Sequence, residues 1–215
     1  LHTYLAYGFG DKKLKGMAEA FFLPNKDPRT YLYASYTNDL DWGQSYYGEV
    51  SQDNVFALAI RKKGIPAKNI KVDEKRFEFF KEVLPWMSNR LTVIHKSTLP
   101  LRNLVPIDSF RATASGDPLT TFEVSVKLRF AWLERFLESH FYRSSLGSAY
   151  PVGEINISRG FSGVFRSSYK YTKLSVSVSD NLKIPPLGNI SWYIYGGKTF
   201  GTLPYTLLDV APGNE

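Results

Sequence analysis

The stretch Thr120-Thr-Phe-Glu-Val-Ser-Val-Lys-Leu-Arg-Phe-Ala131 carries the clearest structural pattern in the chain. Its large apolar residues occupy every second position: Phe122, Val124, Val126, Leu128 and Phe130. The intervening positions are polar or charged: Glu123, Ser125, Lys127 and Arg129. Successive side chains of a β-strand point to opposite faces, so this alternation predicts a strand with one apolar face and one charged face.

Two environments suit such a strand. In a soluble sheet the apolar face meets a core, whereas in a membrane barrel it meets lipid and the charged face lines a wet lumen. The barrel reading predicts that the five apolar residues face lipid and that Glu123, Lys127 and Arg129 face the lumen. Placing those three charges in an apolar wall instead would be strongly unfavourable.

Length and hydropathy narrow the class of protein. The 215 residues contain no apolar run near the ~20 residues that a transmembrane helix needs, so a helical membrane protein is excluded. The mean hydropathy of −0.24 remains compatible with a barrel, in which alternate residues are polar. No signal peptide is visible, and because the chain begins at Leu1 we expect it to be part of a longer protein.

The composition favours a membrane barrel over a soluble domain. Aromatic residues make up 15% of the chain, and membrane barrels use such residues as girdles at both interfaces. The net charge of +7 is spread along the chain, which indicates a solvated or lumenal surface and no nucleic-acid partner. The absence of cysteine excludes disulfides and thiolate metal sites.

The first half of the chain reads as a series of strands. Leu1 to Phe9 and Leu14 to Leu23 predict a hairpin, a third strand begins at Thr30, and Asn38 to Asn54 predicts a long polar loop. Asp73 to Leu84 has helical spacing of its apolar residues but a β-rich neighbourhood, and we favour a strand there.

The second half has a more regular rhythm. It predicts four strands separated by turns or Gly/Ser/Pro-rich loops: Phe136 to Arg143, Val152 to Arg159, Tyr169 to Ser179 and Asn189 to Gly197. Between them lie a loop over Ser144 to Pro151 and a turn over Asp180 to Gly188. Roughly ten strands without crossover helices predict an all-β, antiparallel, up-and-down transmembrane β-barrel, or a large fragment of one.

The chain offers few groups for catalysis. His2, His95 and His140 are its only histidines, and none is spaced from another as a metal pair. We therefore predict a protein that is not an enzyme and has no cofactor and no metal. The alternative is a lipid-modifying barrel that uses His140 with Ser139 or Ser144.

The last segment is too rich in Gly and Pro for a long strand and too apolar for a solvated loop. We expect one β-barrel region over residues 1–215, with residues 198–215 as a loop or plug-like segment after the last strand. This segment would fold onto the rim, plug the lumen, dock a partner or gate the pore. The candidate docking or gating residues are Gly201, Pro204, Leu207, Leu208 and Asn214.

Several motifs resemble one known family. The run Gly197 to Tyr205, followed by Leu207-Leu208 and Pro212-Gly213-Asn214, is similar to the signature of an outer-membrane family of unknown function from Bacteroidota. Tyr7-Gly8-Phe9 and Tyr142-Arg143 resemble the same pattern. In that family a carboxypeptidase-regulatory-like domain precedes a long β-barrel region. The resemblance implies a barrel in the bacterial outer membrane and no particular reaction.

The sequence leaves three hypotheses for function. The first is a non-enzymatic outer-membrane barrel for transport or for envelope assembly, with lipid and other envelope proteins as partners. The second is an Omp85-like factor for assembly of outer-membrane proteins. The third is a soluble β-sandwich or lipocalin-like binding protein, which a closed apolar core would distinguish from the first two.

Overall fold

The computed structural model describes residues 1–9, 12–41, 70–100, 118–139, 143–184, 186, 188–201, 203 and 207. Apart from 3-10 turns at η3 (Val164–Arg166) and at Leu207, the regular structure in these residues is β-strand. The strands are β1 (His2–Gly8), β2 (Lys13–Lys26), β3 (Arg29–Asp41), β4 (Ile70–Leu84), β5 (Met87–Pro100), β6 (Leu119–Phe130), β7 (Arg135–Glu138), β8 (Arg143–Gly147), β9 (Val152–Gly160), β10 (Tyr171–Ile184) and β11 (Gly188–Phe200).

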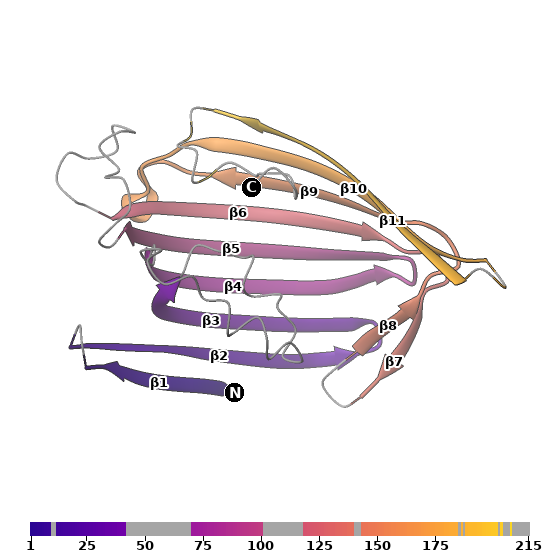
Figure 1. Ribbon diagram of the computed structural model, residues 1–215, viewed down its shortest axis with the longest axis horizontal. Coiled ribbons are helices and arrows are strands. Elements are labelled where there is room, and N and C mark those ends of the chain that lie inside the picture. The colour runs from indigo at the N-terminus through magenta and orange to yellow at the C-terminus, as the bar shows by residue number, and fades with distance from the viewer. Residues whose placement is uncertain are drawn as a thin grey trace.

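Nine of the strands form one antiparallel sheet in the order β1-β2-β3-β4-β5-β6-β9-β10-β11 (Figure 1). Neighbours in the sheet are consecutive in the chain except β6 and β9, between which the hairpin β7–β8 is inserted. The predicted all-β, antiparallel, up-and-down arrangement is confirmed. Within the described residues β1 and β11 are the two edges and do not pair with each other, so the sheet there is open and not a closed barrel.

The ambiguous segment from Asp73 to Leu84 lies in a strand, as the sequence analysis favoured. β4 pairs with β3 on one side and with β5 on the other over almost its whole length. Two full ladders of backbone hydrogen bonds outweigh the local helical spacing of three apolar residues.

Three predictions about the second half are wrong. The predicted strand from Phe136 to Arg143 and the predicted loop after it are instead the hairpin β7–β8. β10 continues to Ile184 through most of the predicted Asp180 to Gly188 turn, because β11 pairs with it up to Gly188. Likewise Gly196 and Gly197 do not end the last strand, since they pair with Val176 and Ser175 and the ladder runs on to Phe200. The segment after the last strand therefore starts at Gly201 and not at residue 198.

The register places side chains of one kind in rows across the sheet. Leu91, Val126, Ile157 and Leu174 are successive partners across β5, β6, β9 and β10. We call this side the apolar face; its residues include Leu5, Ala20, Leu32, Phe77, Phe79, Leu91, Val93, Phe122, Val124, Val126, Leu128, Phe130, Ile155, Ile157, Leu174, Val176, Val178, Ile190, Trp192 and Ile194.

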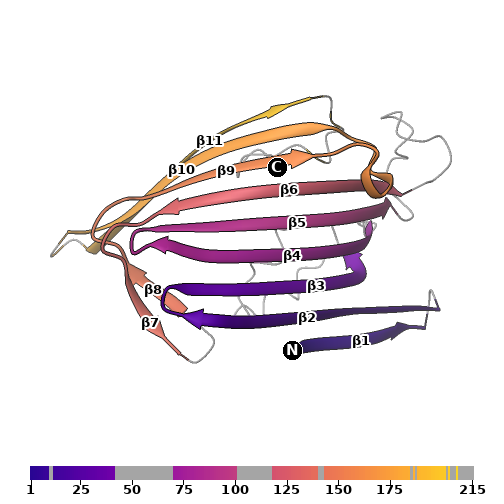
Figure 2. The ribbon, with the colours of Figure 1, turned by 180° about the vertical axis from the view of Figure 1, so that it is seen from behind.

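The opposite side is the polar face. Its residues include Glu19, Tyr33, Ser35, Glu74, Arg76, Glu78, Glu82, Arg90, Thr92, Lys96, Glu123, Ser125, Lys127, Arg129, Glu154, Asn156, Ser158, Ser175, Ser177, Tyr193 and Tyr195. A single hollow is lined by this face from β4, β5, β6, β9, β10 and β11, so the polar face is the concave side of the curved sheet. Figure 2 shows the same sheet from behind.

Burial on the two faces is the reverse of that in a soluble domain. Val126 and Val176 on the apolar face are 36% and 45% exposed, whereas Glu78 and Ser158 on the polar face are 7% and 3% exposed. The buried hydrophobic residues in the described part of the chain are only Val72, Leu119, Ala131 and Tyr171. The described sheet therefore has no apolar core of its own, and its apolar face lies open.

One close contact fixes β6, β9 and β10 together. Glu123, Gly160 and Tyr171 are cross-strand partners on the polar face. The Tyr171 ring lies directly over Gly160, where an added Cβ would be 2.2 Å from ring carbon Cε1. The Tyr171 hydroxyl passes over β9 and donates to Oε2 of Glu123 at 2.5 Å. A glycine is required at position 160 because it leaves room for this ring.

We predict that Gly160→Ala destabilises the sheet, since the new methyl group must displace the Tyr171 ring from its hydrogen bond with Glu123. The expected loss is about 1–3 kcal/mol, the usual cost of overpacking. The measurement is thermal unfolding followed by circular dichroism. Gly153→Ala in the same strand is the control, because a Cβ there meets nothing within 4 Å. Equal effects of the two substitutions would contradict this account of the contact.

Candidate functional surface: the polar face

The centre of the polar face is organised by Glu78. Its Oε1 accepts from Arg76, at 2.5 Å from Nη2 and 2.7 Å from Nε, and its Oε2 lies 3.9 Å from Nε of Arg90. Glu78 and Arg76 share a strand two positions apart, while Arg90 comes from β5. The Glu78 carboxylate is buried, so its ionised form is stabilised by these charged donors and not by water.

A second series of ion pairs crosses from β9 to the turn after β6. Glu154 accepts from Lys127 at 2.8 Å and lies 3.6 Å from Nε of Arg129. Arg129 in turn donates to both carboxylate oxygens of Glu134, at 2.5 and 2.8 Å. The Arg129–Glu134 pair is bidentate and partly shielded from water, and it fixes the end of β6 to the turn that follows.

The inserted hairpin is anchored to the same face two strands away from where it leaves the sheet. Arg143 of β8 pairs with Glu82 of β4, and Glu82 also accepts from the backbone N–H of Arg29 at 2.9 Å. The Arg143 guanidinium lies 3.6 Å from the centre of the Phe136 ring and 3.0 Å from Glu138. The hairpin thus reaches across the end of the polar face from β6 to β4. Sequence reasoning missed this anchor because the pair is separated by 61 residues and has no local signal.

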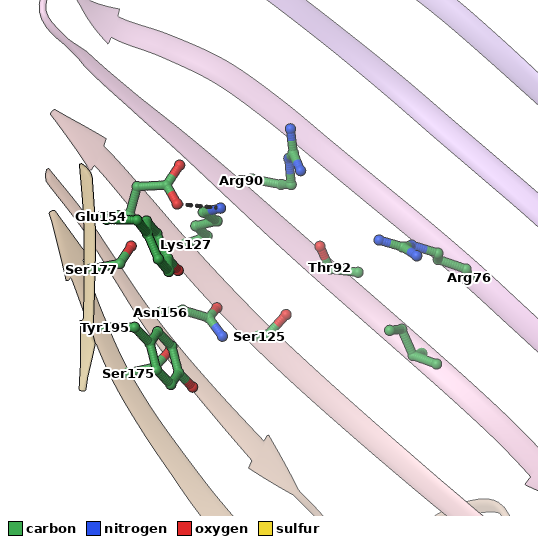
Figure 3. Close-up of a pocket in the computed structure, with 12 residues that line it drawn as sticks. Arg76, Arg90, Thr92, Ser125, Lys127, Glu154, Asn156, Ser175, Ser177 and Tyr195 are labelled. Atoms are coloured by element: carbon green, nitrogen blue, oxygen red, sulfur yellow. Dashed lines mark ion pairs between the residues drawn. The ribbon is translucent and has the colours of Figure 1, made fainter. Parts of the chain in front are cut away.

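The hollow on this face has a volume of about 270 Å³ (Figure 3). Side chains from six strands line it: Arg76, Arg90, Thr92, Ile94, Ser125, Lys127, Glu154, Asn156, Ser175, Ser177, Tyr193 and Tyr195. Apart from Ile94, each of these side chains carries a hydrogen-bonding group. The hollow is therefore suited to a polar ligand.

The residues of the opening stretch divide between the two faces as the alternation predicts. Phe122, Val124, Val126, Leu128 and Phe130 lie on the apolar face, while Glu123, Lys127 and Arg129 lie on the polar face. Phe122 is partly covered, because the rings of Phe161 and Phe165 lie 6.2 and 5.3 Å from its own. Contact of one face with lipid and of the other with a lumen stays a prediction.

The candidate docking residues are only partly described. Gly201 has a φ of +115°, and a Cβ there would lie 2.8 Å from the carbonyl oxygen of Lys170. The positive φ and the close carbonyl oxygen therefore both favour glycine at position 201, directly after β11. Leu207 is half-buried, and Pro204, Leu208 and Asn214 lie outside the described residues.

The histidines show no common site in the described part. His2 lies 3.3 Å from Glu19, and Nε2 of His95 lies 3.2 Å from the carbonyl oxygen of Phe165. His140 is outside the described residues, so the alternative of a His–Ser pair stays a prediction. Among the residues that the structure describes, no three His, Asp or Glu side chains gather as a metal site. No helix there is long and apolar enough to cross a membrane.

We predict that Glu134→Gln destabilises the protein in a pH-dependent way. Burial would raise the pKa of Glu134, but the hydrogen bonds from Arg129 and Ser145 outweigh it and the pKa lies below its ordinary value. The ionised carboxylate therefore stabilises the fold above the unfolded-state pKa of about 4.3, and this contribution is lost as the pH falls through the lower folded-state pKa.

The measurement is the difference in unfolding free energy between the wild type and Glu134→Gln from pH 7 to pH 3. A side chain that is 3% exposed and doubly bonded to an arginine should contribute about 1–3 kcal/mol at pH 7. Glu138→Gln is the matched control, because the Glu138 side chain is 52% exposed and such pairs contribute little. A difference that does not change with pH would contradict the assignment.

Comparison with known proteins identifies the family. Residues 92–211 match the sequence model described as the C-terminal domain of a family of unknown function (DUF5686), a stretch that runs from within β5 to beyond β11. No curated protein and no solved structure gives a significant match. The expected membership of a family without an assigned function is thus confirmed. The match covers more than half of the 215 residues, and the chain belongs to this DUF5686 family.

Proposed function

We propose that this chain forms the wall of a non-enzymatic β-barrel in the outer membrane of a Bacteroidota bacterium, serving transport or envelope assembly. The observation that carries the proposal is the reversed burial of the two faces. Exposed Val126, Ile157, Val176 and Ile194 lie on one side, and buried charged and hydroxyl side chains lie on the other. Lipid around the apolar face would cover the exposed hydrophobic side chains, and water along the polar face would solvate the charged and hydroxyl groups.

The energetics support a cover of lipid over the apolar face. Leaving apolar surface in water costs roughly 25 cal/mol per Å², and soluble monomers rarely expose a contiguous apolar patch of more than a few hundred Å². Exposed apolar residues of this face occur on most strands, among them Leu5, Phe77, Ile157, Leu174 and Ile194. An apolar surface of this extent is stabilised when lipid, and not water, surrounds it.

Strand length supports the same proposal. β4, β5, β10 and β11 contain 15, 14, 14 and 13 residues. At about 3.3 Å per residue such strands reach past the ~25 Å apolar band of an outer-membrane barrel, even when they are tilted.

Aromatic residues lie near both ends of these strands. At one end Trp86, in the turn between β4 and β5, stacks on Trp132 at 4.7 Å. At the other end the ring of Phe165 lies near Phe122 and His95. Aromatic rings at both limits of an apolar band are typical of the girdles that membrane barrels place at the lipid–water interfaces.

The alternatives receive less support. A soluble β-sandwich or lipocalin-like binder needs its apolar face packed against a second layer or enclosed in a core, and the described residues provide no such core. An Omp85-like assembly factor would share the barrel, but no contact in the described part favours it specifically. We assign no reaction to the protein, because Arg76, Glu78, Lys127 and Glu154 are engaged with one another, as suits a wall or conduit.

We predict opposite labelling of two neighbouring positions on β11. The chain has no cysteine, so Tyr193→Cys and Ile194→Cys would each carry a single thiol. Their parent side chains are 63% and 65% exposed but lie on the polar and the apolar face. In isolated outer membranes a water-soluble maleimide should label Cys at 193 and spare Cys at 194, because lipid excludes the reagent.

Two controls accompany this labelling experiment. After the membranes are dissolved in hot dodecyl sulfate, both thiols should react equally, which shows that each was present. Recovery of the protein in the soluble fraction, or equal labelling of both positions in the membrane, would refute the proposed membrane wall.

A further inference from the structure

The hollow on the polar face has an aromatic wall on one side. Tyr193 and Tyr195 project from β11, with ring centres 6.4 Å apart and ring planes inclined by only 15°. Gly197 is the next residue on this face, and a Cβ there would lie 3.0 Å from the hydroxyl oxygen of Tyr195. The two exposed rings therefore form a stacked pair with nearly parallel planes, which we call the Tyr193–Tyr195 platform. Gly197 leaves the position next to this pair without a side chain.

Short polar side chains form the floor beside this platform. Ser175 and Ser177 of β10 are the direct partners of Gly197 and Tyr195, and Asn156 of β9 is the partner of Ser175. Figure 3 shows Ser125 and Thr92 between Tyr195 and the arginines. Because these side chains are short, the space above them stays open.

An arginine wall closes the opposite side. Arg76 is held by two contacts below 3 Å with Glu78, whereas the Nε of Arg90 lies 3.9 Å from the same carboxylate. The Arg90 guanidinium is also hydrogen-bonded to Tyr31 and lies 6.0 Å from the centre of the Phe80 ring. The Nε of Arg90 is buried and has no hydrogen-bond partner among the described residues. The Arg90 side chain as a whole is 40% exposed, so the outer nitrogens of its guanidinium can donate to a ligand in the hollow.

We propose that this hollow binds an oligosaccharide. A sugar ring has a flat face of C–H groups and a rim of hydroxyls, and it needs an aromatic platform and a dense set of donors and acceptors at its edge. The Tyr193–Tyr195 platform provides the aromatic surface. The donors and acceptors are provided by Arg90, Asn156 and the serine hydroxyls. The inference deepens the proposed transport or assembly role by naming the class of its cargo.

Two simpler ligands fit the hollow less well. An inorganic anion would use the arginines but leave the tyrosine platform without a function, and Glu154 and Glu78 would repel it. A purely apolar ligand would leave the hydroxyls and the Arg90 donor without partners. An oligosaccharide uses both walls and the floor.

The test is isothermal titration of the complete protein, purified in detergent, with five probes: maltohexaose, cellohexaose, chitohexaose, mannohexaose and hexagalacturonic acid. Inorganic phosphate is the comparison for simple anion binding. We expect at least one hexasaccharide to bind. In the Tyr193→Ala/Tyr195→Ala double variant that affinity should fall roughly tenfold or more, as is typical when aromatic contacts at the centre of a site are truncated.

Matched variants separate stacking from other effects. Tyr193→Phe/Tyr195→Phe should retain most of the affinity, because the ring faces remain. Arg90→Gln should weaken binding, whereas Lys96→Gln, which breaks the ion pair with Glu74 on the same face outside the hollow, should not. Tyr150→Ala, at an exposed tyrosine in the bend before β9 and outside the hollow, controls for loss of any tyrosine.

Three results would overturn the proposal: no hexasaccharide binds, binding is unchanged in the double alanine variant, or phosphate binds as tightly as the sugars. The hollow belongs to the sheet itself, so this failure is distinguishable from failure of the membrane proposal. If the protein is found in the outer membrane but binds no sugar, that result contradicts the oligosaccharide proposal and leaves the membrane proposal standing.

Discussion

The strict alternation of side chains across an antiparallel register is the constraint on which the rest of this structure depends. Along the middle of the sheet the strands separate apolar from polar residues, and the ladders align those strands so that like residues share rows. Nearer the strand ends a few charged residues, such as Lys75, Arg159 and Lys198, lie on the apolar face. A slip of one residue in any ladder would move charged side chains such as Lys127 onto the apolar face. The ion pairs of Glu78 with Arg90 and of Glu154 with Lys127 join neighbouring strands on the polar face and oppose such a slip.

The reversed burial explains why the polar face is so extensively paired. In a soluble protein the exposed charges of a sheet are solvated and their pairs contribute little. Here the concave side crowds charged side chains together, and each partly desolvated carboxylate needs donors nearby. Glu78 with Arg76, and Glu154 with Lys127, meet this need without any contribution from the apolar face.

Much of the sheet could be predicted from sequence, because the decisive signal is local. The alternation from Phe122 to Phe130 identifies its two faces within one strand. By contrast, the ends of β10 and β11 depend on pairing between them, and pairing overrides the turn signals at Asp180 and Gly196. The hairpin β7–β8 was missed because four- and five-residue strands carry too little periodicity. The hollow could not be predicted either. Its lining extends from Arg76 to Tyr195 across six strands, and no local spacing in the sequence indicates that these residues lie close together.

The central claim is that lipid, and not a protein core, covers the apolar face. The most direct measurement is refolding of the urea-denatured complete protein, with far-ultraviolet circular dichroism and heat-dependent gel mobility as readouts. The protein is diluted either into vesicles of dilauroyl phosphatidylcholine or into the same buffer without lipid. The account predicts native β-structure and a heat-sensitive gel shift only with vesicles. Equal refolding to a monodisperse soluble protein without lipid would contradict it.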